Sequence, residues 1–544
     1  MSTLTFDRVS FTWPDGTAAL TEVSGSFSAG RTGLVGRNGS GKSTLLRLAS
    51  GKLQPTDGTI IADGTDLAGS TVAYLPQTIT AAADARVSEL LGVSAALDAV
   101  RAVTAGDVSD AHFEAIGDDW DIEARSHAAL AAVGLAPTML DRTVGELSGG
   151  EAMLAALTGI RMQRAAITLL DEPTNNLDRA ARAAVYNLVA AWRGTLIVVS
   201  HDATLLNLMD ETAELYDGSI TTFGGPYDAW RDWLEIQQQA ARAAASEARK
   251  SLTHEKQQRI DAETKLARRA RYARNDFENK RRPRMIMKLR GQEAQVSAGK
   301  LRGQAQQKEL LARSSLADAE AVVRADTSLH IELPDPQISA SRRIAELGDG
   351  NHTWVLQGAE TVALVGANGS GKTTLLSHLL GQEQLAAHPA TGDRVRSASR
   401  LHTERVAHIA QSVSGEDDSV TAYEAVKSVA PHMPDREVTN QLARFLLRGD
   451  KAHRRLADLS GGERFRVSLA RMLLADPTPE LLVFDEPTNN LDLETVDQLL
   501  DALAAYRGAV IVVSHDDDFL RRLHPHLVLE LNDDALTALT FDES

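Results

Sequence analysis

Two octapeptides of the same form, Gly36-Arg-Asn-Gly-Ser-Gly-Lys42-Ser43 and Gly366-Ala-Asn-Gly-Ser-Gly-Lys372-Thr373, decide the fold of this chain of 544 residues. Each follows a short β-branched, apolar run that predicts a strand and precedes a Leu-rich stretch that predicts a helix. The glycines let the backbone curl, so that successive N–H groups point at phosphate oxygens beside the positive end of the helix. The pattern is that of a phosphate-binding loop, and the chain carries it twice.

The two loops predict where a nucleoside triphosphate binds. Lys42 and Lys372 would contact its β and γ phosphates, and the hydroxyls of Ser43 and Thr373 would ligate Mg²⁺. A glycine-rich turn with an incidental lysine is the alternative, and two complete matches in the same context make it much weaker. The predicted loop residues are Gly36, Arg37, Asn38, Gly39, Ser40, Gly41, Lys42, Ser43 and Thr44 in the first copy and Gly366, Ala367, Asn368, Gly369, Ser370, Gly371, Lys372, Thr373 and Thr374 in the second.

Three further motifs recur in the same order in both halves. They are Leu147-Ser-Gly-Gly-Glu151 with Leu459-Ser-Gly-Gly-Glu463, the octapeptide from Asp171 to Asp178 with that from Asp485 to Asp492, and Val198-Val-Ser-His-Asp202 with the repeat from Val512 to Asp516. Between the motifs, short β-rich runs alternate with Ala- and Leu-rich stretches. That alternation predicts an α/β fold, in which two domains each have a largely parallel sheet covered by helices.

The repeat and a change of composition divide the chain. We expect a first nucleotide-binding domain at residues 1–228, a helical linker at 229–326 and a second nucleotide-binding domain at 327–544. From Gln77 to Ser148 the first copy holds 22 more residues than the second holds from Gln411 to Ser460. This excess predicts a small extra segment at residues 85–135 of the first domain.

Acidic and histidine side chains follow the predicted strands at the same edge of each sheet. An aspartate there can hold Mg²⁺ through water, and the glutamate after it can polarise the attacking water as a general base. A solvated acidic pair capping a helix is the alternative, and a lone histidine would more often be structural, but the repetition favours catalysis. The predicted Mg²⁺ ligands are Asp171 and Asp485, the predicted general bases Glu172 and Glu486, and the predicted γ-phosphate contacts His201 and His515.

The residues between the domains have the composition of long helices. From Arg231 to Ala325 the segment has a net charge of +10, although the whole chain has −17. Because Arg282-Pro-Arg284 interrupts the pattern, we expect two antiparallel helices joined near Pro283 to Gly299. Arginine suits RNA phosphates and bases, whereas for any single residue simple solvation of the helix pair is the alternative. The RNA-contact candidates are Arg271, Arg274, Lys280, Arg281, Arg282, Arg284, Lys288 and Arg290.

The composition excludes several classes of protein. The chain has no cysteine, so it forms no disulfide and no cysteine-ligated zinc site or iron–sulfur cluster. No run of about 18 uncharged apolar residues predicts a membrane span. The first residues lack the basic and apolar pattern of a secretory signal, and we therefore expect a cytoplasmic protein.

Taken together, the motifs resemble those of ATP-binding cassette (ABC) ATPases over both halves, with Leu-Ser-Gly-Gly-Glu as the family's signature. The resemblance implies two cassettes facing each other head to tail, each ATP lying between the phosphate loop of one and the signature of the other. Trp13 resembles the aromatic that stacks on adenine, and the second copy has no clear counterpart because Trp354 lies too near the phosphate loop. The resemblance further implies Mg²⁺ contacts from Gln77 and Gln411, partner-cassette contacts from Asp178 and Asp492, and ATP contacts from Ser148, Gly149, Gly150, Ser460, Gly461 and Gly462.

Two fused cassettes with a basic helical linker and no membrane segment resemble the ABC-F group, whose members act on the ribosome. The resemblance implies a monomer that uses ATP and Mg²⁺ and binds no DNA or membrane, with the linker reaching toward tRNA and the peptidyl-transferase centre. Ribosome-recycling and excision-repair ABC ATPases need cysteine-bound metal, and chromosome-maintenance ATPases carry their coiled coil within one cassette. The alternative that remains is an ATPase subunit that energises a separate membrane transporter. The short extra segment and the 29 residues after His515 favour a compact, resistance-type member, and translation regulation stays open.

Overall fold

The computed structural model describes residues 2–62, 65–66, 72–79, 83–278, 284–324, 334–381, 398–409, 418–459, 461–489, 491–532 and 535–539. By their contacts the residues form two compact units, one of Met1–Asp228 with Ser328–Ser544 and one of Ala229–Thr327. In the first unit, two hydrophobic cores contain only residues 4–220 and two contain only residues 338–539. We call residues 2–228 the first domain and residues 334–539 the second domain. Within the described residues, no helix is both long and apolar enough to cross a membrane.

The first domain is built on one ten-stranded sheet of order β5-β4-β1-β2-β10-β9-β3-β8-β7-β6. The strands β9, β3, β8, β7 and β6 are paired in parallel, and β7 and β8 are buried at every residue. Such strands need helices on both faces. The strands are β1 Leu4–Thr12, β2 Ala18–Phe27, β3 Arg31–Val35, β4 Asp57–Ala62, β5 Thr65–Asp66, β6 Val72–Leu75, β7 Ile167–Asp171, β8 Thr195–Val199, β9 Glu211–Tyr216 and β10 Ser219–Phe223.

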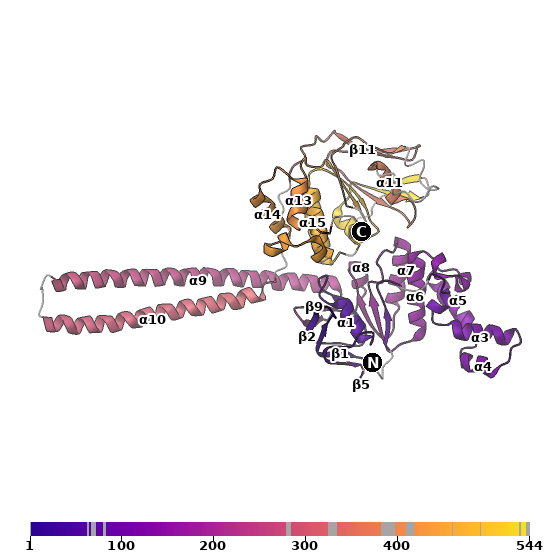
Figure 1. Cartoon of the computed structure of the whole chain (residues 1–544), viewed down its shortest axis with the longest axis horizontal. Helices are drawn as coiled ribbons and strands as arrows, with labels where there is room; N and C mark the ends of the chain where they lie inside the picture. Colours follow the sequence, from indigo (N-terminus) through magenta and orange to yellow (C-terminus); the bar gives the residue numbers. More distant parts are fainter. Residues whose placement is uncertain are drawn as a thin grey trace. The chain divides into compact units, whose positions relative to one another are not determined.

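The helices of the first domain cover the parallel part of this sheet and add a small insertion. Between β6 and β7, helices α3 and α4 pack against each other and fall in the segment where the sequence predicts extra residues (Figure 1). The α-helices are α1 Lys42–Ala49, α2 Val87–Leu90, α3 Ser94–Thr104, α4 Asp110–Ile116, α5 Ile122–Ala132, α6 Gly149–Gln163, α7 Arg179–Ala190 and α8 Ala203–Leu206.

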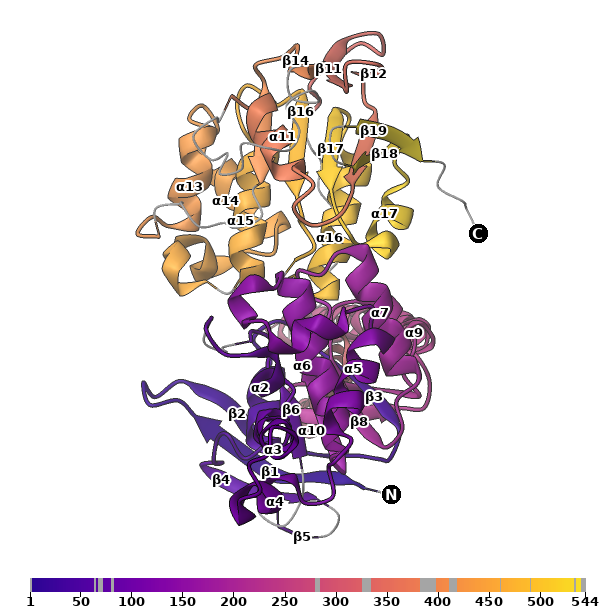
Figure 2. The same ribbon diagram turned by 90° about the vertical axis from the view of Figure 1, so that its right-hand side faces the viewer.

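The second domain repeats this plan with fewer paired strands. Its six-stranded sheet has the order β15-β16-β17-β13-β18-β19, and β12-β11-β14 form a separate three-stranded sheet. Helices α13, α14 and α15 gather beside the parallel strands (Figure 2). The elements are β11 Arg343–Gly348, β12 Thr353–Gln357, β13 Thr361–Val365, α11 Lys372–Leu379, β14 Arg400–Leu401, β15 Val406–Ile409, α13 Ala422–Val429, α14 Asp435–Arg444, α15 Gly461–Leu473, β16 Leu481–Asp485, α16 Leu493–Ala505, β17 Ala509–Val513, α17 Asp517–Leu523, β18 Leu527–Asn532 and β19 Ala535–Leu539.

The linker forms the predicted antiparallel helix pair, α9 Tyr227–Glu278 and α10 Arg284–Val322 (Figure 1). Arg259 of α9 donates to Glu309 of α10 at 2.6 Å, and Arg249 donates to Glu320 at 2.6 Å. The prediction of a junction extending to Gly299 was wrong, since α10 begins at Arg284 and continues through its glycines. A glycine inside a helix costs only about 1 kcal/mol, which this long helix tolerates.

Candidate functional site

The first phosphate loop connects β3 to α1 and brings Lys42 back over its own backbone. Lys42 begins α1, and its Nζ donates to the carbonyl oxygens of Gly36 at 2.6 Å and Arg37 at 3.0 Å. The glycine before it, Gly41, has φ 98°, and a Cβ there would lie 2.4 Å from Leu20, so only glycine fits. Lys42 is 6% exposed, and its ammonium therefore sits in a nearly enclosed, loop-lined position suited to phosphate.

The general-base candidate Glu172 directly follows β7 and has an unusual backbone. Its φ of 52° lies in the left-handed region, which is uncommon for a residue with a side chain and is enriched at functional sites. The Glu172 N–H donates to Val199 O at 2.8 Å, which ties the residue to the end of β8. His201, just after β8, donates its N–H to Glu172 Oε2 at 3.3 Å. Its Nε2 lies 3.3 Å from Glu172 Oε1 and 3.1 Å from Asn38 Oδ1, so one imidazole links the acidic group to the phosphate loop.

The metal-ligand candidates of the first site already contact each other. Ser43 Oγ donates to Asp171 Oδ1 at 3.0 Å, and Tyr74 Oη donates to Asp171 Oδ2 at 3.0 Å. A hydroxyl and a carboxylate at this distance present oxygen ligands, which Mg²⁺ prefers. The residues present therefore fit a magnesium ion beside the phosphate loop.

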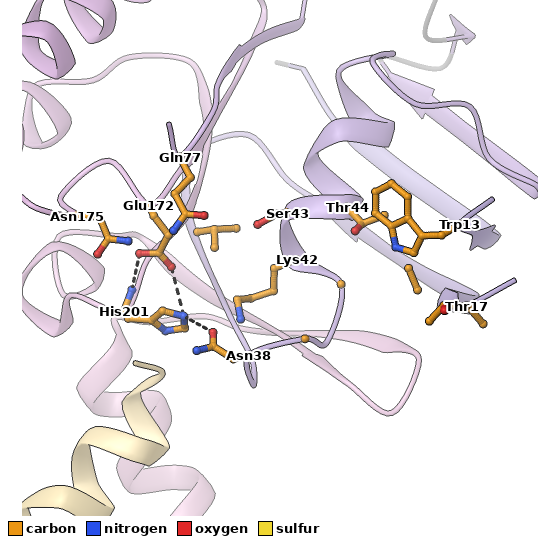
Figure 3. A pocket seen from close by; sticks show the side chains of 15 residues that line it. Trp13, Thr17, Asn38, Lys42, Ser43, Thr44, Gln77, Glu172, Asn175 and His201 are labelled. Atoms are coloured by element: carbon orange, nitrogen blue, oxygen red, sulfur yellow. Dashed lines mark hydrogen bonds and ion pairs between the residues drawn. The ribbon is translucent and has the colours of Figure 1, made fainter. Parts of the chain in front are cut away.

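Around these residues lies a cavity of about 350 Å³, lined by Trp13, Lys42, Gln77, Glu172 and His201 among others. Glu172 and His201 lie on one side of Lys42 and Trp13 on the other, with Ser43 and Thr44 between them (Figure 3). Phe11 holds the Trp13 ring in an edge-on contact, with ring centres 4.9 Å apart. The cavity thus has a polar end for phosphates and a flat aromatic end for a base.

The second site repeats the polar end closely. Lys372 Nζ donates to Gly366 O at 2.8 Å and to Ala367 O at 2.9 Å. Glu486 has φ 49°, and His515 donates its N–H to Glu486 Oε2 at 3.3 Å. The cavity here is about 280 Å³, and the described residues that line it include Asp485, Glu486 and His515 but no aromatic ring apart from the histidine.

Burial shifts the charges of both sites in the same directions. It raises the pKa of Glu486 to about 7 and lowers the pKa of His515 to about 3. Burial likewise raises the pKa of Glu172 against the opposing charge of Lys42, and it lowers the pKa of His201. The histidines are therefore neutral near pH 7, and the Nε2 atoms of His201 and His515 lie 3.3 Å and 3.4 Å from a carboxyl oxygen of their glutamates. A carboxyl with a pKa near 7 suits a general base.

The second site also contains several buried polar atoms that have no hydrogen-bond partner among the described residues. A buried polar group without a partner costs about 1–3 kcal/mol, so each such atom needs an explanation, and beside a phosphate loop a ligand or ion supplies one. These atoms surround the loop that would hold the phosphates, and they therefore fit an anionic ligand with a bound cation. They are Ser370 Oγ, Asp485 Oδ1, Glu486 Oε1, Thr488 Oγ1 and His515 Nε2.

Residues of one domain reach the phosphate loop of the other. Asp492 begins α16 and accepts a hydrogen bond from the Asn38 N–H at 2.8 Å. In the opposite direction, Asn368 Nδ2 donates to Asn176 O at 3.2 Å, and Asn176 and Leu177 line the second cavity. Asp492 thus lies where the family resemblance expects a contact to the partner cassette, whereas the reciprocal contact uses a backbone carbonyl.

Several predicted site residues are not brought to these cavities. Among the described residues that line them, none comes from the signature segments, so the ATP contacts of Ser148, Gly149, Gly150, Gly461 and Gly462 remain predictions. Predicted residues outside the described part of the chain, or with undescribed side chains, are Gln411, Ser460, Lys280, Arg281, Arg282, Arg284, Lys288 and Arg290.

Sequence reasoning also missed functional candidates. Asn175 and Asn489 line the two cavities from equivalent positions of the repeated octapeptide. Their repetition in the sequence could therefore have identified them as candidates. Thr17 lines the adenine end of the first cavity, and Tyr74 holds Asp171. Neither of these stands in a repeated motif, since His408 takes the place of Tyr74 in the second domain, and no local pattern could reveal them.

Two phosphate loops, each with a strained glutamate and a histidine at the ends of neighbouring parallel strands, define a tandem P-loop ATPase. A profile of the ABC transporter family matches residues 20–175 and 350–489. The tylosin resistance ATP-binding protein TlrC of Streptomyces fradiae is 31% identical over 92% of this chain and 92% of its own. The energy-dependent translational throttle protein EttA of Haemophilus influenzae is 29% identical over 96% of this chain and 91% of its own.

A third relative, the human ATP-binding cassette sub-family F member 3, is 31% identical over 90% of this chain and 66% of its own. The structure of the archaeal ribosome recycling factor aABCE1 with the stalk protein aP1 has a TM-score of 0.53 at 19% identity, over 96% of this chain and 87% of that chain, which shows the fold alone. The chain belongs to the ABC family, in its F group, and is an enzyme that hydrolyses ATP.

Proposed function

We propose that this ATPase binds the ribosome when ATP closes its two domains and leaves it when hydrolysis opens them. The observation that carries this proposal is the exposed basic end of α9, where Arg268, Arg269 and Arg271 point to solvent. Tyr272 stands beside them and is 70% exposed. Arginine with an exposed aromatic is the combination that binds RNA phosphates and stacks on unpaired bases.

The names of the relatives support the same activity. One is a translational throttle protein and another confers tylosin resistance, and each aligns with more than nine-tenths of this chain. We place the protein in the cytoplasm as a monomer, with ribosomal RNA and tRNA as the partners of the hairpin near the peptidyl-transferase centre. Mg²⁺ would be held by Ser43, Asp171 and Gln77 in the first site and by Thr373, Asp485 and Gln411 in the second.

In each site the chain's own residues would divide the work of hydrolysis. Lys42 and Lys372 would neutralise phosphate charge from positions already fixed by the loop carbonyls. Glu172 and Glu486 would orient and deprotonate water, and the bound ion would stabilise the charge that develops on the phosphate oxygens. His201 and His515 would contact the γ-phosphate through their imidazoles while their backbone N–H groups remain bonded to those glutamates.

Ribosome co-sedimentation tests the proposal. A variant with Glu172→Gln and Glu486→Gln would bind ATP without hydrolysing it, and we expect it to pellet with ribosomes in ATP but not in ADP. Neutralising Arg268, Arg269 and Arg271 to Gln should weaken binding and flatten its salt dependence, because each lost phosphate contact lowers the log–log slope by about 0.7–0.9.

The matched control neutralises the exposed Lys250, Lys256 and Lys308, which removes three charges elsewhere on the hairpin. The control should retain the salt slope of the parent. Failure of the hydrolysis-deficient variant to pellet with ribosomes at moderate salt would overturn the proposal. Growth of a drug-sensitive bacterium with and without the protein, across several classes of ribosome-targeting drugs including tylosin, would separate drug protection from translation control.

A further inference from the structure

Two aspartates occupy equivalent positions directly after the site histidines. Asp202 follows His201 and begins α8, accepting from the Leu205 N–H at 3.0 Å. Asp516 follows His515 and begins α17, accepting from the Phe519 N–H at 3.0 Å. Each aspartate is thus fixed by a helix cap and moves with the histidine segment of its own site.

One arginine lies between these two carboxylates. Arg182 of α7 is 8% exposed, and its Nη1 lies 3.9 Å from Asp202 Oδ2. Burial works to lower the pKa of Arg182, but the charges of Asp202, Asp516 and Glu486 outweigh it and raise that pKa. Acids of both domains therefore stabilise this buried cation, with Asp202 at ion-pair distance and Asp516 acting through its charge.

The second domain has no equivalent arginine. In the repeat, Val496 takes the place of Arg182, and Leu500 takes the place of Tyr186. Tyr186 Oη donates to Asp202 Oδ2 at 2.6 Å and completes the polar cluster from the first domain alone. Each aspartate is held by a backbone N–H of its own helix, whereas among the described residues the arginine and the tyrosine that approach Asp202 both come from the first domain.

Arg182 also holds the backbone that lines the second site. Its Nε donates to Leu177 O at 3.2 Å. Leu177 and Asn176 line the second cavity, and Asn176 O accepts the hydrogen bond from Asn368 of the phosphate loop. At the first site the corresponding segment of the second domain is held differently, since Asp492 accepts from the N–H groups of Asn38 and Thr495, and Glu494 pairs with Arg37 of the phosphate loop.

We propose that Arg182 is a positioning residue that couples the two ATP sites, and that it affects the rate of hydrolysis at the second site only. It contacts the histidine segment of the first site through Asp202 and faces that of the second through Asp516. Through its hydrogen bond to Leu177 O, Arg182 also holds the Asn176–Leu177 loop against the second phosphate loop. A shift of the His201–Asp202 segment when phosphate leaves the first site releases Arg182, and with it the loop of the second site.

Single-site variants of the full chain test this coupling. With Glu172→Gln only the second site hydrolyses ATP, and with Glu486→Gln only the first does. In the Glu172→Gln background, where only the second site is active, we expect Arg182→Met to lower kcat at least tenfold with little change in KM. In the Glu486→Gln background, where only the first site is active, Arg182→Met should change kcat less than threefold. Arg182→Lys should recover part of the loss because it keeps the charge. Equal losses in both backgrounds would overturn the proposal.

A second pair of variants separates coupling from folding. Asp202→Asn keeps the helix cap but removes the charge beside Arg182, and it should slow the second site although Asp202 belongs to the segment of the first. Asp516→Asn should partly restore Arg182→Met, because it removes the like charge that faces Asp202. Arg125→Met is the matched control, since its ion pair with Asp119 is exposed and Arg125 lines neither ATP cavity, so it should change neither site. A loss confined to the first site in Asp202→Asn, or no rescue by Asp516→Asn, would contradict the inference.

Discussion

The first and second ATP sites carry the same motif residues in nearly the same geometry, yet their surroundings differ. In the first site Asp171 is bonded to Ser43 and Tyr74, His201 to Asn38, and Trp13 closes the cavity with an aromatic face. In the second site Asp485 and His515 each have a buried atom without a partner in the described part of the chain. The repeated motifs therefore determine which reaction each site can perform. The residues around the motifs determine how many polar atoms of each site have hydrogen-bond partners.

The largest effect that tests this comparison is removal of the general bases. Glu172→Gln together with Glu486→Gln should reduce steady-state ATP hydrolysis at least about 100-fold, because a positioned base contributes about 10²–10⁴-fold. Each single variant should leave one working site. If surroundings matter, the two residual rates will be unequal; equal residual rates and equal KM values would show that the motifs alone determine activity.

Much of this comparison was accessible from the sequence, and some of it was not. The strands that lead to Asp171 and Asp485 were predictable, because buried parallel strands are continuous apolar runs. The start of α10 at Arg284 could not be predicted, because the continuation of the helix through Gly291 and Gly299 depends on packing along the hairpin. Arg182 and Tyr74 act through contacts far apart in the chain, and no local pattern marks such residues.

The next largest effect concerns stability of the second domain. Glu480 is 4% exposed and accepts hydrogen bonds from Arg342 at 3.1 Å and from Arg405, whereas Ala166 takes its place in the first domain. Glu480→Ala leaves two partly exposed arginines without their shared acid and should destabilise the second domain by about 1.5–3 kcal/mol, the contribution of a hydrogen bond to a charged group. Thermal unfolding of the full chain would measure this. Asp435→Asn, which breaks a pair between the exposed Asp435 and Lys427, should change the melting temperature much less, because solvent screens this pair.

The same carboxylate gives a pH dependence with a definite sign. Burial acts to raise the pKa of Glu480, but hydrogen bonds from Thr403, Arg405 and Arg342 lower it from 4.5 to about 2. A lowered folded-state pKa stabilises the protein above the unfolded value, and this stability is lost as the pH falls from 4.5 toward 2. Glu480→Ala should therefore show a smaller fall in melting temperature over this range than the parent, and an unchanged slope would contradict the assignment.

A smaller effect tests the adenine end of the first cavity. Trp13→Ala should raise KM for ATP about tenfold at the first site, because stacking of a base on an aromatic ring contributes about 1–3 kcal/mol. The measurement uses the Glu486→Gln background, in which only the first site hydrolyses. Trp354→Ala is the control, since Trp354 packs on His352 with ring centres 5.8 Å apart and lines neither cavity. Equal KM shifts in both variants would remove Trp13 as the distinguishing feature.

The smallest effect concerns a charge pair present at only one phosphate loop. Arg37 Nε lies 2.9 Å from Glu494 Oε2, with the two side chains 46% and 25% exposed, whereas Ala367 stands at the equivalent place of the other loop. Because solvent screens such a pair, Arg37→Met should weaken the apparent ATP affinity of the hydrolysis-deficient protein only a few-fold, about 1 kcal/mol at most. The difference should vanish between about 0.01 M and about 1 M salt, where the screening length falls from about 30 Å to about 3 Å. The adjacent contact of Asp492 with the Asn38 N–H is nearly buried, so loss of affinity in Asp492→Ala should persist at high salt. A salt-independent loss in Arg37→Met would instead mean that the arginine acts on the loop itself and not through the opposite domain.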